Sequence, residues 1–195
     1  MGGMTLGVFA RDHAEELAAR VAALYFVATS ACGIEMSWRR GSLRTMYGLA
    51  GFALLNGLKR PSPRYPWPDN DLSAVLIRAA FGPKATADMV DAVRRMSADM
   101  ATASMIEAGA ALAGHDVRDD LRHIQLPTAV VVGDVDRLTP PGHARLIAES
   151  VEGATITVLP DVGHQIMQED PHALVQGIDA LSAAARRGAG APPTH

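Results

Sequence analysis

The sequence predicts an α/β fold: a three-stranded parallel sheet with flanking helices and a helical insertion. Three short apolar runs carry this prediction, at residues 21–28, 128–132 and 155–159. The first two are almost continuously apolar, as is typical of strands buried on both faces, and the third is rich in β-branched residues. A helical pattern separates the second run from the third, and this order implies parallel pairing through right-handed crossovers.

Helical patterns precede and follow the first of these runs. Residues 3–18 are typical of a helix. Residues 36–66 differ in character, because they contain six basic residues and no acidic one, and closely spaced prolines mark their end. This composition indicates an insertion and not an element of the sheet.

A long helical pattern begins after Gly82-Pro83 and continues, with a break, to Gly114. One face of it carries a methionine stripe: Met89, Val93, Met96 and Met100. Unbranched thioethers adapt to irregular apolar ligands, so the stripe is a candidate pocket lining. Ordinary packing between helices is the simpler interpretation.

The remaining elements lie in the last third of the chain. A short polar helix is expected at residues 115–124, before the second strand. Pro140 and Pro141 suit the first turn of the helix between the second and third strands. Pro171 opens a last helix, which we expect to end at about Ala185.

The composition excludes several classes of function. A hydrophobic fraction of 48% supports a sizeable core, and a formal net charge of −3 provides no overall field to hold a nucleic-acid backbone. No run approaches the roughly 18 apolar residues of a membrane span. Cys32 is the only cysteine. A single cysteine cannot form an internal disulfide, so we expect a reducing compartment, the cytoplasm. No Cys/His spacing is typical of a zinc site, so we expect no metal, and no other cofactor is indicated.

Two polar segments follow the second and third predicted strands, where a parallel sheet places its chemistry. Asp134 and Asp136 come after one strand and His164 after the next. The carboxyl ends of neighbouring parallel strands share one edge of the sheet, so Asp136 and His164 can meet. A carboxylate on one ring nitrogen would hold the tautomer whose other nitrogen takes a proton from a hydroxyl. Taken singly, each residue also has an ordinary structural explanation, as a helix cap or a turn residue.

Two glycines accompany these residues. Gly133 is expected to let the chain turn sharply off its strand, and Gly163 to relieve crowding where the histidine loop approaches the site.

The segment from Leu121 to Ser182 resembles the closing third of the α/β-hydrolases. The matching pieces are, in order, Leu126-Pro127-Thr128, the apolar strand, residues 133–140, residues 158–164 and Glu169-Asp170-Pro171. The resemblance implies a partial α/β-hydrolase fold in which Asp136 is the acid of a catalytic triad and His164 is the general base. Asp134 is the less favoured acid because it lies closer to the strand.

The amino terminus carries a second, shorter resemblance. Met1-Gly2-Gly3-Met4, followed by a helix, resembles the Gly-His-Ser-Met-Gly-Gly sequence that often holds the nucleophilic serine of these enzymes. In that alignment the serine precedes Met1, and Met1 takes the place of the residue whose backbone N–H donates to the oxyanion hole. The serines of the chain lack a Gly-x-Ser-x-Gly setting; they are Ser30, Ser37, Ser42, Ser62, Ser73, Ser97, Ser104, Ser150 and Ser182. We therefore expect a truncated chain that is inactive alone.

The resemblance also implies a division of the chain. Residues 1–32 would hold the helix after the nucleophile and the first remaining strand, residues 33–120 a helical cap or lid, and residues 121–187 the core with the acid and the histidine. Residues 188–195 are small residues, prolines and a terminal histidine, and are expected to be disordered.

Two functions remain open at this point. The first is a serine hydrolase acting on a small apolar ester or similar acyl substrate; a relative with an aspartate nucleophile fits the Met-Gly-Gly start less well. The second is a non-catalytic interaction protein, or one half of a split enzyme, that binds a partner or a second copy of itself through the exposed edge of the first strand. The nucleotides upstream of the first codon would distinguish the two.

Overall fold

The structure is a computed structural model that describes residues 1–33, 71–99 and 101–189. The basic segment expected as an insertion, residues 36–66, and Met100 of the methionine stripe lie outside the described residues.

One parallel sheet forms the centre of the molecule. Its strands are β1 (Leu24–Val27), β2 (Thr128–Gly133) and β3 (Thr155–Leu159), in the order β1-β2-β3. Phe26 lies opposite Val130 in the register of β1 and β2. The parallel pairing confirms the predicted sheet, although β1 begins later than its apolar run suggested.

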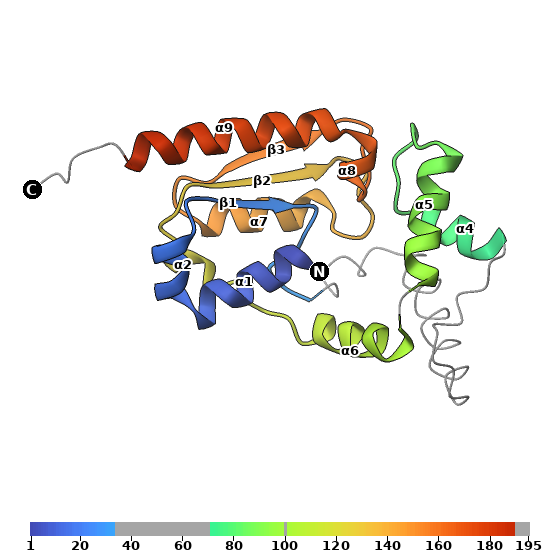
Figure 1. The fold of residues 1–195 in the computed structure, drawn as a ribbon, viewed down its shortest axis with the longest axis horizontal. Coiled ribbons are helices and arrows are strands. Elements are labelled where there is room, and N and C mark those ends of the chain that lie inside the picture. Colours follow the sequence, from blue (N-terminus) through green and yellow to red (C-terminus); the bar gives the residue numbers. More distant parts are fainter. Residues whose placement is uncertain (34–70, 100, 190–195) are drawn as a thin grey trace, which may run out of the picture.

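Helices cover both faces of this sheet (Figure 1). α9 (Pro171–Ala189) lies along one face, and α7 (Pro141–Ser150) and α1 (Gly2–Asp12) lie on the other. Successive residues of β2 point to opposite faces and join different buried clusters, so both faces of the strand must be apolar. On the α7 side the cluster includes Leu24, Phe26, Val130, Val132 and Ile147, and on the α9 side it includes Val131, Leu159, Val162 and Ile166.

The amino-terminal residues form two helices, not the single helix predicted for residues 3–18. α1 ends at Asp12, and α2 (Ala14–Arg20) follows His13, whose backbone is not helical, with φ −137° and ψ 47°. The break lets Ala10 of α1 and Leu17 of α2 reach the same core. His13 is neither glycine nor proline, so no local signal marks the break in the sequence.

Three helices occupy the described part of the expected cap. α5 (Ala87–Ala98) and α6 (Thr102–Ala113) are the two parts of the predicted long pattern, whereas α4 (Asp71–Arg78) was not predicted. The Thr86 hydroxyl accepts the Met89 N–H at 3.4 Å and caps the start of α5. Figure 1 shows α4 and α5 beyond the carboxyl ends of the strands.

The methionine stripe does not act as one surface. Met89 and Val93 pack against a buried cluster of Ile77, Phe81 and Val90, which joins α4 to α5. Met96 is 59% exposed. The packing interpretation therefore holds for Met89 and Val93.

The carboxyl-terminal elements follow the prediction with three differences. The polar helix expected at residues 115–124 is only a 3₁₀ turn at Leu121–His123, and a short helix, α8 (Ile166–Glu169), was not predicted. α9 ends at Ala189, so residues 188 and 189 of the expected disordered tail are helical; the rest of that tail lies outside the described residues. In the parts of the chain that the structure describes, no helix combines the length and apolar character of a membrane span.

Candidate active site

Asp136 lies in the turn that leaves β2, and its carboxylate is held by four hydrogen bonds. Oδ1 accepts the backbone N–H groups of Leu138 at 2.8 Å and Thr139 at 2.9 Å. Oδ2 accepts the Thr139 hydroxyl at 2.9 Å and lies 2.9 Å from Nδ1 of His164. The side chain is 0% exposed, so these donors replace the water that a buried carboxylate loses.

His164 follows β3 and faces Asp136, as the position of both residues at strand ends predicted. A carboxylate can only accept a hydrogen bond, so the 2.9 Å contact places the ring proton on Nδ1 and leaves the lone pair on Nε2. The Thr139 hydroxyl, 3.3 Å from Nδ1, lies against the same edge of the ring. Because the histidine side chain is 24% exposed, its ring can also meet a reacting group.

Asp134, the second candidate acid, has another partner. Its Oδ1 accepts the backbone N–H of Asp161 at 2.8 Å. Asp161 has φ 59°, in the left-handed region, and begins the loop that carries His164. Asp134 therefore ties the two loops together at the end of the sheet.

Gly133 is required by a close approach. A Cβ atom at Gly133 would overlap the carbonyl oxygen of Val162 in the histidine loop. The sharp turn expected at Gly133 is not the reason, since its φ is not among the positive ones. A Cβ atom at Gly163 would overlap the backbone of Ala80 and Phe81, which confirms the expected crowding there.

Glu169 contacts both neighbours of His164, although the sequence analysis predicted no role for it. Its carboxylate accepts backbone N–H groups of Gly163 and Gln165, on both sides of His164, and of Gly82 in the segment between α4 and α5. The Glu-Asp-Pro spacing after the histidine was the available signal, but it indicated only the family.

A buried serine–histidine contact was also missed by the sequence analysis. The Oγ atom of Ser30 lies 2.6 Å from Nδ1 of His143, and both residues are buried, at 1% and 3% exposure. Ser30 Oγ also accepts the Cys32 N–H at 3.1 Å and donates to the Cys32 carbonyl at 2.6 Å. Burial lowers the pKa of His143, while the charge of Asp136 acts in the opposite direction. Its burial and its backbone bonds identify Ser30 as a structural residue.

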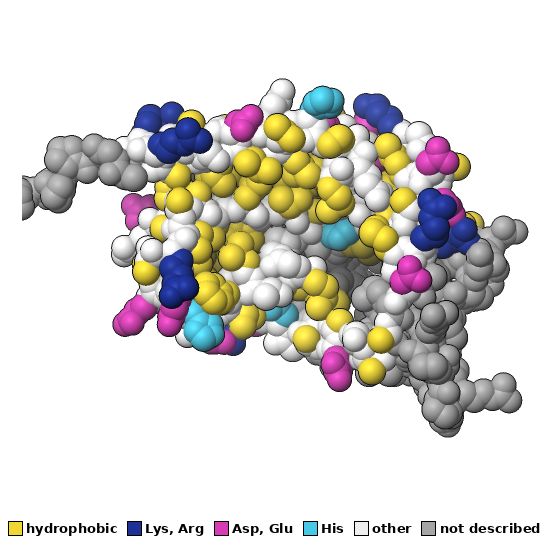
Figure 2. All heavy atoms as spheres, viewed as in Figure 1, with side chains coloured by type: hydrophobic (Ala, Val, Ile, Leu, Met, Phe, Trp, Pro, Cys, Tyr) yellow, Lys and Arg dark blue, Asp and Glu magenta, His cyan; other side chains and the backbone are white. Residues whose placement is uncertain are grey.

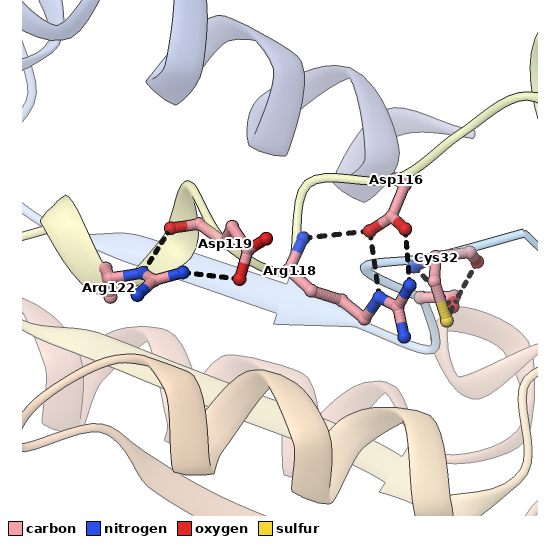
Figure 3. A network of polar contacts seen from close by, with 6 residues as sticks. Cys32, Asp116, Arg118, Asp119 and Arg122 are labelled. Atoms are coloured by element: carbon pink, nitrogen blue, oxygen red, sulfur yellow. Dashed lines mark hydrogen bonds and ion pairs between the residues drawn. The ribbon is translucent and has the colours of Figure 1, made fainter.

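The Ser30 turn is anchored to the chain that follows α6. Cys32 forms an antiparallel bridge with Asp116, and Asp116 pairs with Arg118 at 2.5 Å (Figure 3). Hydrogen bonding to Arg118 lowers the pKa of Asp116 to about 2. His115 lies beside them; burial lowers its pKa, and its Nε2 atom is buried without a hydrogen-bond partner among the described residues.

The start of α1 lies next to the end of β1. Gly3 of α1 packs so closely on Thr29 that a Cβ atom would lie 2.6 Å from the threonine hydroxyl oxygen. Met1, the residue assigned to the oxyanion hole, is exposed and precedes the first turn, where its carbonyl accepts the Thr5 N–H at 3.0 Å. None of the serines in the described residues lies at the start of α1.

The sequence and the structure were compared with known proteins. The sequence model described as "Alpha/beta hydrolase family" matches residues 1–176. Among solved structures, an esterase from Exiguobacterium antarcticum matches with a TM-score of 0.69 and 17% identity over 91% of this chain and 62% of that chain. A thermophilic esterase from Thermogutta terrifontis matches with a TM-score of 0.70 and 20% identity over 94% and 62%.

A third match has a different catalytic activity. A bromoperoxidase from Bacillus anthracis has a TM-score of 0.54 and 15% identity over 58% of this chain and 45% of that chain. At these identities the likeness shows the fold and leaves the reaction open. The chain spans 62% of the length of the two esterases.

Proposed function

This chain belongs to the α/β hydrolase family, and on that premise we propose that it supplies the acid and the base of a serine hydrolase acting on esters or similar acyl substrates. The observation that carries the proposal is the 2.9 Å contact between Nδ1 of His164 and the buried carboxylate of Asp136. We further propose that the nucleophilic serine is supplied by polypeptide outside residues 1–195.

The geometry of the pair fits acyl transfer. The serine hydroxyl attacks the carbonyl carbon of the ester while its proton passes to Nε2 of His164. The imidazolium formed is stabilised by Asp136 and returns the proton to the departing alkoxide. Water then attacks the acyl-enzyme, again losing a proton to His164, and the serine is released with the acid product.

Met1 and the cap complete the proposed site. In a chain where another residue precedes Met1, its peptide N–H would donate to the oxyanion at the start of α1. Residues 33–120 are proposed as the cap, with α4 and α5 beyond the carboxyl ends of the strands as described. The two similar structures are described as esterases, which supports an ester as the substrate, and we propose a small apolar one.

Labelling with a serine-reactive fluorophosphonate tests the proposal. We expect no labelling of the 195-residue chain, and labelling when the chain is extended by the in-frame sequence upstream of Met1. In the extended protein, His164→Ala should abolish labelling, whereas the matched change His172→Ala at an exposed position of α9 should not. Labelling of the 195-residue chain that depends on His164 would reveal a nucleophile within it, and an unlabelled extended protein would refute the serine mechanism.

A second candidate function, binding through the open edge of β1, is favoured by a specific feature. In the described residues β1 pairs with β2 alone. Beside the unpaired edge is a groove lined by Ala22, Ala23 and Tyr25 and, on α9, by Ile178, Leu181 and Ala185. Figure 2 shows hydrophobic side chains gathered on this face. We propose as its occupant a strand of another polypeptide segment, paired with β1 and covering the groove.

A further inference from the structure

We propose that Glu169 is a positioning residue that fixes His164 and makes the orientation of the imidazole depend on the cap segment at Gly82. This inference rests on the proposed role of His164 as the general base. Glu169 does not touch the reacting atoms; it acts through the backbone on both sides of the histidine.

The contacts of Glu169 enclose His164. Its Oε1 accepts the Gly163 N–H at 3.0 Å and the Gln165 N–H at 3.3 Å, so the residues before and after the histidine are held by one oxygen. Oε2 lies 3.1 Å from the Gly163 nitrogen. With both neighbours held by one carboxylate, the backbone of His164 has little freedom to rotate its ring away from Asp136.

The same carboxylate reaches the cap. Oε2 accepts the Gly82 N–H at 2.6 Å, and the His164 N–H donates to the Ala80 carbonyl at 2.7 Å. A Cβ atom at Gly82 would overlap the carbonyl oxygen of Asp161 in the histidine loop, so the two backbones approach as closely as glycine allows. The chain that follows α4 therefore donates one hydrogen bond to Glu169 and accepts another from the backbone of His164.

The chemistry requires a carboxylate at this position. Three backbone donors converge on its two oxygens, and bonds from N–H groups to an ionised acceptor are stronger than those to a neutral one. Glutamine has the same shape but only one oxygen. Its amide NH₂ would face an N–H donor and leave at least one of the three backbone groups without an acceptor.

The test compares Glu169→Gln with Glu152→Gln, a matched change at an exposed loop position, in the 195-residue chain. Proton and nitrogen NMR of the histidine rings reports which ring nitrogen of His164 carries the proton. In the wild type and in Glu152→Gln we expect the Nδ1–H form and a resolved Nδ1–H signal. In Glu169→Gln we expect that signal to be lost and the two tautomers to mix, while the amide signals of β2 stay in place.

A folded Glu169→Gln variant that keeps the Nδ1–H signal would overturn the inference. If the variant fails to fold, hydrogen exchange of the wild type decides. If the amides of Gly82, Gly163 and Gln165 are protected and exchange at the same rate, they open together, and this supports their common attachment to Glu169. An unprotected Gly82 amide refutes the link to the cap. Neither measurement needs a nucleophile, so failure here leaves the labelling test of the proposed function unaffected, and failure of labelling leaves this result standing.

Discussion

Two histidines lie in unlike surroundings, His164 in the loop after β3 and His143 in the first turn of α7, and their surroundings decide what each can do. His164 is partly exposed and bonds to a buried carboxylate, an arrangement suited to proton transfer. His143 is buried and bonds to a serine hydroxyl that the Cys32 backbone also holds. A serine–histidine contact is thus not by itself a sign of catalysis. His164 differs from His143 in that its ring reaches solvent and a carboxylate holds its Nδ1 atom.

Acid should destabilise the fold through His143 and His115. Burial lowers the pKa of both below 6.5, the ordinary value for histidine, so the unfolded chain binds more protons once the pH falls toward that value. The contribution of the two neutral histidines to the free energy of unfolding is therefore complete above pH 6.5. It declines as the pH falls toward their lowered pKa values. We expect the melting temperature to drop between about pH 7.5 and about pH 5.5.

The matched variants for this prediction are His143→Gln and His172→Gln. Glutamine at position 143 can still bond to Ser30 but does not titrate, so the acid-induced drop should become smaller. His172 is exposed on α9, and its replacement should leave the pH dependence as in the wild type. An equal drop in all three proteins, measured by thermal denaturation, would contradict the prediction.

At the scale of elements, the contact between β2 and the histidine loop limits which residue can end the strand. We expect Gly133→Ala to lower the free energy of unfolding by about 2 kcal/mol or more, because a Cβ atom would displace the Val162 carbonyl. Gly142→Ala on α7, where a Cβ atom meets nothing within 4 Å, should be neutral or stabilising by up to about 1 kcal/mol. Urea denaturation of both variants measures the difference, and equal effects would refute it.

Elements were predictable where the pattern is local. The three strands and α7 follow from apolar runs and from Pro141, whereas the break at His13 has no local signal, because it serves to bring two helices onto one core. α8 is too short for a periodic pattern to show. The polar segment at residues 115–124 has helical composition, but Asp116 and Arg118 bond to each other, and Asp116 forms a β-bridge with Cys32 instead.

At the scale of the whole molecule, the edge of β1 that is unpaired among the described residues is the contact surface that we propose for association. Ala23→Lys places a charge in the groove beside that edge, and we expect it to reduce self-association or aggregation of the chain. Ala180→Lys makes the same change at an exposed position of α9 outside the groove lining, and should have no such effect. Sedimentation velocity over a range of concentrations compares the two, and equal behaviour would count against the edge as the contact surface.

The candidate site is also a property of the whole molecule. Asp136 comes from the end of β2, His164 from the end of β3, and the segment at Gly82 from between α4 and α5. The sequence could place the first two at one edge because parallel strands share their carboxyl ends. It could not place Gly82 there, since no pattern in residues 71–99 indicates which loop they contact.

The sequence by itself determined the parallel sheet, the order of acid and histidine along it, and the family, because these depend on local apolar patterns and on fixed spacings. The tertiary structure alone decided why Gly133 must be glycine, what Asp134 and Glu169 contact, and that Ser30 pairs with His143. The physical reason is that hydrogen bonds and close backbone contacts between distant segments depend on how these segments pack, to within a few tenths of an ångström. No pattern along the chain encodes a position with that precision.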